Sequence, residues 1–164
     1  MTSMQEIQRL VLIGAGATAL LDAWLLVLRR AGVPGLDFAH LGRWAGHLLH
    51  GRFRHAAIAR SAPVAGERAW GWLAHYAIGI AFAAALVAIE GWAWVRQPTL
   101  MPAVVFGLLT TLAPLAILQP AMGAGFAASR TPTPMKNRLR SLANHTVFGL
   151  GLYLSAAIAA MPWH

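Results

Sequence analysis

Residues 99–122 read TLMPAVVFGLLTTLAPLAILQPAM, a run without a charged side chain. Because an α-helix rises about 1.5 Å per residue, about 20 apolar residues cross a hydrocarbon core of about 30 Å. Three other apolar stretches of similar length occupy residues 8–28, 72–95 and 141–162. The pattern predicts an all-α, polytopic membrane protein with four transmembrane helices.

The composition supports this class of protein. Charged residues make up 11% of the chain and the mean hydropathy is +0.58, both unusual for a soluble domain of 17.5 kDa. The chain has no cysteine, which excludes disulfides, thiol catalysis and cysteine-based metal sites. We expect a single transmembrane domain over residues 1–164.

The positive charge predicts the topology. Eleven of the 13 Lys and Arg residues lie in two segments, 29–71 and 123–140. Under the positive-inside rule both segments are cytoplasmic loops, and both termini lie on the opposite side. Anionic lipid headgroups are the natural partner for these charges. The chain has no Lys-rich tail, so the net charge of +8 does not predict a nucleic-acid partner.

Residues 36–60 carry apolar and basic side chains on different helical faces. This pattern predicts an interfacial amphipathic helical segment between the first and second spans, with a break at Gly51. Four side chains on its basic face are expected to contact lipid headgroups: Arg43, His47, His50 and Arg54. We expect His40 and His55 on a solvated surface as well, and little change in stability on replacing Arg43 or His47 with alanine.

Each predicted span carries one polar residue in its cytoplasmic half. Counting about 1.5 Å per residue from the cytoplasmic end of each helix places Asp22 about 10.5 Å deep, His75 about 12 Å, His145 about 7.5 Å and Gln119 about 4.5 Å. Ionisable groups inside a membrane are costly and usually face the protein interior. We therefore predict a polar site there. The candidates for holding a ligand or proton are Asp22, Glu67, His75, Gln119, Ser129, Arg130 and His145.

The two membrane histidines have several interpretations. Gly79 follows His75 by one helical turn, and Gly149 follows His145 in the same way. Each glycine leaves room for a close helix crossing, a metal ion or the edge of a b-type haem. Hydrogen bonds from the histidines to polar side chains of other helices would instead only fix the packing. A metal ion or haem held by His75 and His145 would make the protein an enzyme or a redox protein.

Four long motifs carry a family resemblance. They are GRWAGHLLHGRFRH at 42–55, GERAWGWLAHY at 66–76, QPAMGAGFAASRTP at 119–132 and SLANHTVFGLGLY at 141–153. Through them the chain resembles, over essentially its whole length, the bacterial membrane family labelled domain of unknown function 2938. The resemblance implies a small multi-pass protein of the bacterial inner membrane and assigns no catalytic role. Together with the charge pattern, it implies that both termini are periplasmic.

Three functions of different class remain. The first is a non-enzymatic membrane protein whose polar site binds or conducts a small ligand, ion or proton. It is favoured because polar groups cluster, whereas phosphate-binding loops, nucleophile motifs and zinc-protease motifs are missing from the sequence. The second is the metal- or haem-dependent enzyme, and the third is a structural or partner-binding subunit. Small residues on the helix faces favour a homo-oligomer in each case.

Overall fold

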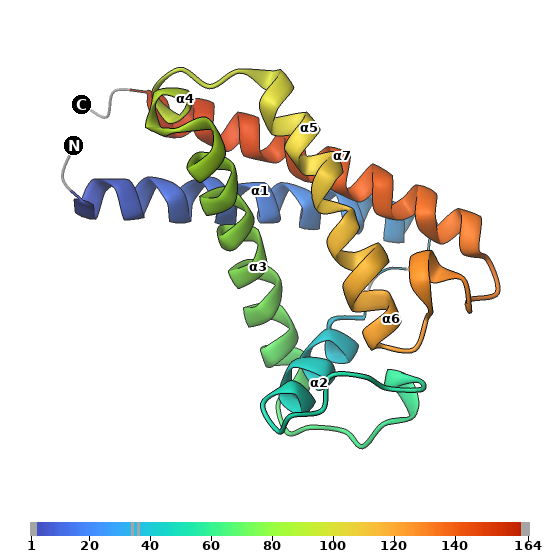
Figure 1. The fold of residues 1–164 in the computed structure, drawn as a ribbon. Coiled ribbons are helices and arrows are strands. Elements are labelled where there is room, and N and C mark those ends of the chain that lie inside the picture. The colour runs from blue at the N-terminus through green and yellow to red at the C-terminus, as the bar shows by residue number, and fades with distance from the viewer. Residues whose placement is uncertain (1–2, 34, 36, 162–164) are drawn as a thin grey trace. The chain divides into compact units, whose positions relative to one another are not determined.

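The computed structural model describes residues 3–33, 35 and 37–161 (Figure 1). No strand occurs in this part of the chain, which confirms the all-α prediction. Residue 162, the last of the predicted fourth span, lies outside the described residues. In chain order the elements are α1 (Ser3–Arg30), α2 (Phe38–Leu48), η1 (Ile58–Arg60), α3 (Glu67–Glu90), α4 (Trp92–Arg96), α5 (Leu100–Thr110), η2 (Ala113–Leu118), α6 (Gln119–Ala121), η3 (Phe126–Ala128) and α7 (Pro134–Ala160).

Four helices are long and apolar enough to cross a membrane: α1, α3, the composite helix Leu100–Ala121, and α7. Within the chain, only 22% of the most apolar window is buried in each of the first three, and 33% in α7. Exposed apolar surface of this extent needs lipid or a partner to cover it. The prediction of a polytopic membrane protein with four spanning helices is therefore confirmed.

The second span begins and ends earlier than its apolar run predicts. Helix α3 covers Glu67–Glu90 instead of residues 72–95. It stops because Gly91 adopts a positive φ of 78°, which glycine tolerates without a Cβ clash. The short helix α4 (Trp92–Arg96) follows, and its Trp94 Nε1 donates to the carbonyl of Thr99 at 3.2 Å.

The fourth span begins before the position predicted from hydropathy. Helix α7 starts at Pro134, whereas the apolar run starts at residue 141. Proline suits the first turn of a helix, where its missing N–H would have no partner. Three basic residues of the predicted loop 123–140 therefore lie on the first turns of α7: Lys136, Arg138 and Arg140. Because these residues are charged, the apolar run does not include the first turns of the helix.

The third span is irregular. Regular helix α5 ends at Thr110, and the backbone widens into the π-helical turn η2 (Ala113–Leu118) before α6. Pro114 lies in this turn, and proline cannot donate the usual backbone hydrogen bond, so the departure from α-helical geometry has a local cause. The chain then leaves the helix through Gly123, whose φ is +93°.

The predicted amphipathic segment contains one helix, α2 (Phe38–Leu48). The Asp37 side chain caps it by accepting from the amide of Ala39 at 2.9 Å. The break at Gly51 is confirmed, since its φ is +76° and residues beyond it are not part of α2.

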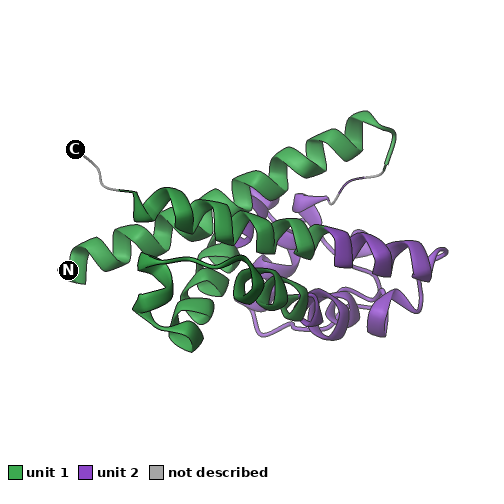
Figure 2. Ribbon diagram, turned by 90° about the horizontal axis from the view of Figure 1, so that it is seen from above, with its two compact units in different colours: residues 1–34, 76–110, 144–164 green, residues 35–75, 111–143 purple. Residues whose placement is uncertain are grey.

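The chain divides into two compact units (Figure 2). Unit 1 comprises residues 1–34, 76–110 and 144–164, and unit 2 comprises residues 35–75 and 111–143. The first residues of α3 and of α7 belong to unit 2, and the remainder of each helix belongs to unit 1.

Unit 1 has an apolar core that includes Ile13, Leu86 and Leu152, each at most 1% exposed. Its helices approach closely at small residues. A Cβ on Gly149 of α7 would lie 2.8 Å from the Ala103 carbonyl oxygen of α5. Real Cβ atoms do not come this near, so these helices pack backbone to backbone as small-residue crossings do in membranes.

Unit 2 contains α2, η1, the first turns of α3, the elements η2, α6 and η3, and the first turns of α7. Helices α2 and α3 cross where Gly42 faces Gly71; a Cβ on Gly71 would collide with the Phe38 carbonyl oxygen. Two backbone hydrogen bonds join the segment after α2 to the end of α6: His55 N to Ala121 O at 2.8 Å, and Ile58 N to Met122 O at 3.0 Å. The packing of unit 2 thus depends on glycines and on backbone pairing between distant segments.

Candidate functional site

In unit 1, an aspartate in a spanning helix is hydrogen-bonded to a tyrosine. Asp22 of α1 accepts a hydrogen bond from the Tyr76 hydroxyl of α3, with 2.9 Å between the oxygens. Both side chains are half-buried. The phenolic O–H can donate to a carboxylate and can also accept, so the pair can hold a proton or orient a polar ligand.

A histidine in another spanning helix contacts a threonine of the same unit. The Nδ1 atom of His145 in α7 lies 2.8 Å from the Thr110 hydroxyl oxygen of α5. That hydroxyl donates its single proton to the Gly107 carbonyl at 2.6 Å, so it accepts from His145. This pattern places the proton of neutral His145 on Nδ1 and leaves the lone pair on Nε2, the atom able to accept a proton.

A third polar pair joins α1 to α7. Trp24 Nε1 of α1 donates to the Asn144 side-chain oxygen of α7 at 3.0 Å. Asn144 directly precedes His145, and Trp24 lies two residues after Asp22. Helices α1, α3, α5 and α7 therefore each contribute a polar side chain to a hydrogen-bonded pair within unit 1.

The structure assigns the predicted site residues to different units. Asp22 and His145 belong to unit 1, and the other five belong to unit 2: Glu67, His75, Gln119, Ser129 and Arg130. The shared site therefore stays a prediction. The glycines that follow the two histidines do have a demonstrated role, because a Cβ on Gly79 would collide with the Thr18 hydroxyl and Gly149 faces α5. Both serve close helix crossings.

In unit 2, His75 lies against aromatic rings. Its ring centroid is 4.7 Å from that of Phe38 and 6.0 Å from that of Trp72. Gln119 donates weakly to the Ser141 hydroxyl at 3.5 Å, and its buried side-chain oxygen has no hydrogen-bond partner in the described part of the chain. Ser129 and Arg130 are exposed on the turn that follows η3.

Glu67 forms a charged pair that organises unit 2. Its two carboxylate oxygens accept from Nε and Nη2 of Arg43, both at 2.8 Å. The remaining Arg43 nitrogen, Nη1, donates to three loop carbonyls between 3.1 and 3.3 Å, those of Ile58, Ala59 and Ser61. The hydrogen bond from Arg43 to Glu67 raises the pKa of Arg43. The planar guanidinium of Arg43 thus binds the Glu67 carboxylate at two points and also binds the loop carbonyls, which fixes the loop to α2 and α3. We call this set of contacts the Arg43–Glu67 clamp.

Arg43 is therefore not on the exposed basic face where we expected it. Its side chain is 13% exposed and that of Glu67 is 19% exposed. A small effect of Arg43→Ala on stability is no longer expected, since five hydrogen bonds depend on this side chain. The predicted headgroup residues His50 and Arg54 are exposed, and their contact with lipid stays a prediction.

Two loop histidines form an unexpected pair. His47 Nε2 lies 2.9 Å from the Ala62 carbonyl, which can only accept, so this nitrogen donates. In neutral His47 the Nδ1 atom then accepts from His55 Nε2 at 3.0 Å. Nδ1 of His55 is left with a lone pair and no hydrogen-bond partner in the described chain. His55, expected on a solvated surface, is in fact 5% exposed.

Burial lowers the pKa of His55, and the nearby charges of Arg52 and His47 lower it further. The imidazole therefore stays neutral to lower pH than a solvated histidine does. Within the described residues, no group of three or more His, Asp or Glu side chains is placed to hold a metal ion. The metal- or haem-dependent interpretation, which uses the two residues His75 and His145, stays a prediction.

Several contributing residues were missed in the sequence. They are Tyr76, which is bonded to Asp22, Thr110, which is bonded to His145, and Asn144, which is bonded to Trp24. In each case the hydrogen-bond partner is far away in the chain. The useful signal was the presence of hydroxyl or amide side chains inside apolar spans, since such groups need partners in a membrane.

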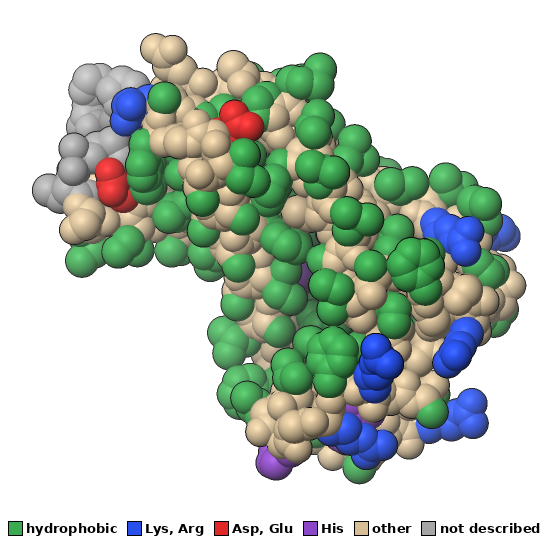
Figure 3. Space-filling view, in the orientation of Figure 1, with side chains coloured by type: hydrophobic (Ala, Val, Ile, Leu, Met, Phe, Trp, Pro, Cys, Tyr) green, Lys and Arg blue, Asp and Glu red, His purple; other side chains and the backbone are tan. Residues whose placement is uncertain are grey.

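On the face shown in Figure 3, blue Lys and Arg side chains gather over elements of unit 2, and green apolar side chains cover much of the rest. The comparisons with curated proteins and with solved structures give no match. The comparison with protein families matches residues 11–159 to the family described as "Protein of unknown function (DUF2938)". This match covers most of the chain and agrees with the resemblance carried by the four sequence motifs. The chain therefore belongs to this family.

Proposed function

We propose that this multi-pass membrane protein binds or conducts a proton through the polar groups of unit 1. The observation that carries the proposal is the pair of ionisable side chains in spanning helices, Asp22 and His145, each hydrogen-bonded to a hydroxyl. A carboxylate and an imidazole can both take up and release a proton. Ionisable groups in membrane helices are costly, and they are commonly retained along ion and proton pathways.

The hydroxyl groups have a defined task in this proposal. Tyr76 orients the Asp22 carboxylate, and Thr110 fixes the tautomer of His145 so that Nε2 is the proton acceptor. The Trp24–Asn144 hydrogen bond supports the backbone beside both ionisable residues. Removal of an ionisable group should therefore abolish proton movement, whereas removal of a hydroxyl should slow it.

The test is a proton-flux measurement on the full chain in liposomes that contain a pH-sensitive dye. After a potassium gradient sets the membrane potential, we expect wild-type vesicles to change internal pH faster than empty vesicles. Asp22→Asn and His145→Gln should return the rate to that of empty vesicles, and Tyr76→Phe should give an intermediate rate. Glu90→Gln is the matched control, because Glu90 is an exposed carboxylate at the end of α3. A wild-type rate equal to that of empty vesicles, or an unchanged rate in Asp22→Asn, would refute the proposal.

The orientation and the partners are further parts of the proposal. The basic segments 29–71 and 123–140 support a cytoplasmic location for both loops and a periplasmic location for both termini of an inner-membrane protein. Alkaline phosphatase fused after residue 164 should then be active, and activity only in fusions within 36–60 would reverse the orientation. The exposed His50 and Arg54 support contact with anionic lipid headgroups, and the uncovered apolar helix surface supports a homo-oligomer.

A further inference from the structure

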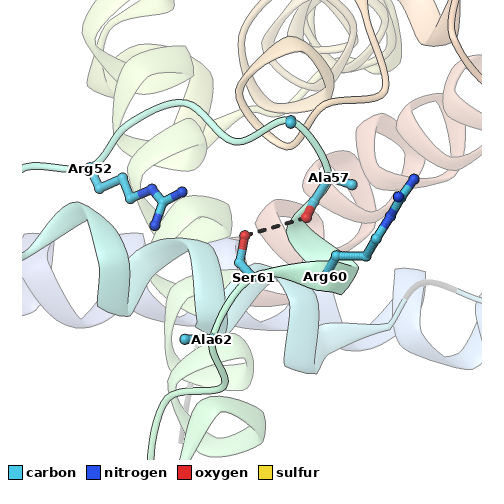
Figure 4. Close-up of a pocket in the computed structure, with 6 residues that line it drawn as sticks. Arg52, Ala57, Arg60, Ser61 and Ala62 are labelled. Atoms are coloured by element: carbon cyan, nitrogen blue, oxygen red, sulfur yellow. Dashed lines mark hydrogen bonds between the residues drawn. The ribbon is translucent and has the colours of Figure 1, made fainter.

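Unit 2 contains a pocket that lies outside the polar pairs of unit 1. It has a volume of about 370 Å³ and is lined by Arg52, Ala56, Ala57, Arg60, Ser61 and Ala62. Figure 4 shows the Arg52 side chain reaching toward Ser61, while Arg60 extends on the other side of Ala57. The Ser61 hydroxyl donates to the Ala57 carbonyl at 3.3 Å. The pocket thus has a cationic group, a hydroxyl and backbone groups along its wall.

The positive charge at this pocket has no local counter-charge. Unit 2 holds nine of the 13 Lys and Arg residues but only two of the five acidic residues, a net charge of +7. Of those acids, Glu67 is bonded to Arg43 at both oxygens, and Asp37 caps α2. Neither Arg52 nor Arg60 is paired with a carboxylate among the described residues. An anion from outside the chain would supply the missing charge.

Three of the residues that line the pocket have backbone amides that the fold does not use. The amides of Ala56, Ala57 and Ala62 donate to no group in the described part of the chain. By contrast, the neighbouring amides of His55 and Ile58 are bonded to Ala121 and Met122. Backbone amides without partners, together with arginine, form the usual donor set for phosphate.

Two side chains of α2 hold the loop that carries these groups by bonding to its carbonyls. Nη1 of Arg43 is bonded to the carbonyls of Ile58, Ala59 and Ser61, and His47 is bonded to the carbonyl of Ala62. These four carbonyl groups are thereby occupied by internal donors, whereas the amides of Ala56, Ala57 and Ala62 are left for another partner. This arrangement favours an anion over a cation.

We propose that this pocket binds a phosphate group, with Arg52 as the principal charge partner and the backbone amides as further donors. Arg60 borders the site and contributes less, because its side chain extends away from Arg52 (Figure 4). The phosphate belongs to a lipid headgroup or to a small soluble phosphate compound, which share this chemistry. The site is independent of the proton site proposed for unit 1.

The experiment uses the full chain in mild detergent and two probes. Isothermal titration calorimetry measures binding of inorganic phosphate. Native mass spectrometry compares retention of phosphatidic acid with that of diacylglycerol, which has the same tails without the phosphate. Saturable binding of inorganic phosphate identifies a soluble ligand, and retention of phosphatidic acid alone identifies a lipid headgroup.

Matched variants decide whether the pocket is responsible. Arg52→Gln should weaken binding about tenfold, as expected for loss of a charge-assisted hydrogen bond. Arg68→Gln is the control, since Arg68 is an exposed arginine of the same unit that does not line the pocket, and its effect should be much smaller. Equal weakening in both variants would show a general basic surface and overturn the proposal. The proposal would also be overturned if phosphatidic acid were retained no better than diacylglycerol and inorganic phosphate did not bind.

Discussion

Different interactions stabilise the interior of unit 1 and the interior of unit 2. Unit 1 has an apolar core, close helix crossings at glycines, and a net charge of only +1 from four basic and three acidic residues. Unit 2 carries a net charge of +7, and its loops are tied by the Arg43–Glu67 clamp and by backbone hydrogen bonds. Polar pairs occur in both units, but in unit 1 they join helices and in unit 2 they mainly satisfy loop backbone.

The difference follows from what each kind of backbone needs. A helix satisfies its own N–H and C=O groups, so unit 1 can present apolar side chains to lipid and use small residues for close packing. An irregular loop cannot do this, and its carbonyls need donors. Arg43 meets that need for three carbonyls of unit 2 at once. Four predictions probe this contrast.

The largest effect is expected at the helix crossing of unit 2. Gly71→Ala adds a Cβ that collides with the Phe38 carbonyl, and a backbone atom cannot rotate away as a side chain can. We expect a loss of about 3 kcal/mol in the free energy of unfolding. Unfolding of the purified protein in detergent, followed by circular dichroism, measures it.

The equivalent change in unit 1 should cost less. A Cβ on Gly149 would lie 2.8 Å from the Ala103 carbonyl oxygen, a milder overlap, and we expect Gly149→Ala to cost about 1–2 kcal/mol. Gly35→Ala is the control, because no atom lies within 4 Å of a Cβ there. If Gly71→Ala were no more destabilising than Gly35→Ala, the described crossing of α2 and α3 would be wrong.

The second prediction concerns the clamp of unit 2. Arg43→Ala should lower the Tm clearly, because Glu67 and three loop carbonyls lose their donor. Arg43→Lys should recover only part of the loss, since an ammonium group cannot reproduce the planar fork. Arg54→Ala, at an exposed arginine of the same unit, should leave the Tm nearly unchanged. Equal Tm values for the two alanine variants would contradict a structural role for Arg43.

The third prediction concerns the polar pairs of unit 1. Tyr76→Phe removes the hydrogen bond to Asp22 and should cost about 1 kcal/mol of unfolding free energy. Tyr153→Phe is the matched control, because its hydroxyl has no hydrogen-bond partner in the described part of the chain. Both variants remove a tyrosine hydroxyl, so the same stability in both would show that the Asp22 contact is dispensable.

The smallest effect is a pH dependence from His55. Its pKa is lowered in the folded protein from 6.5, the value taken for a solvated imidazole, so the unfolded chain binds the proton more strongly. The stabilising contribution is therefore complete above about pH 6.5 and decreases as the pH falls toward the folded pKa. Unfolding free energies measured across this window should decrease less in His55→Asn than in wild type. His50→Asn, at an exposed histidine, should keep the wild-type slope; a wild-type slope in His55→Asn would exclude His55 as its source.

Helix content and membrane class were predictable because they depend on local properties. Apolar length locates a spanning helix wherever the run lies, and a glycine or proline such as Gly51 or Pro114 marks a local departure from the helix. Helix boundaries were less predictable. The first turns of α7 are basic, so hydropathy predicted the start of this helix too late in the chain. The break at Gly91 interrupts an apolar run, so hydropathy also predicted the end of α3 too late.

The candidate site was only partly predictable. Depth counting selected Asp22 and His145, but it did not identify Tyr76 or Thr110 as their hydrogen-bond partners. Helical periodicity assigned Arg43 to a headgroup-facing surface, because a helical wheel shows which residues share a face but not what lies opposite. Glu67, 24 positions away in the chain, was opposite it.

The sequence by itself therefore determined that this is an all-α protein with four membrane-spanning helices and two basic segments, since chain length, hydropathy and charge are properties of local segments. Only the tertiary structure decided that Arg43 is a clamp, that His55 is buried, and that the loop 52–62 leaves amides and arginines without internal partners. These features arise from contacts between residues distant in the chain, and burial and pairing depend on such contacts rather than on residue type.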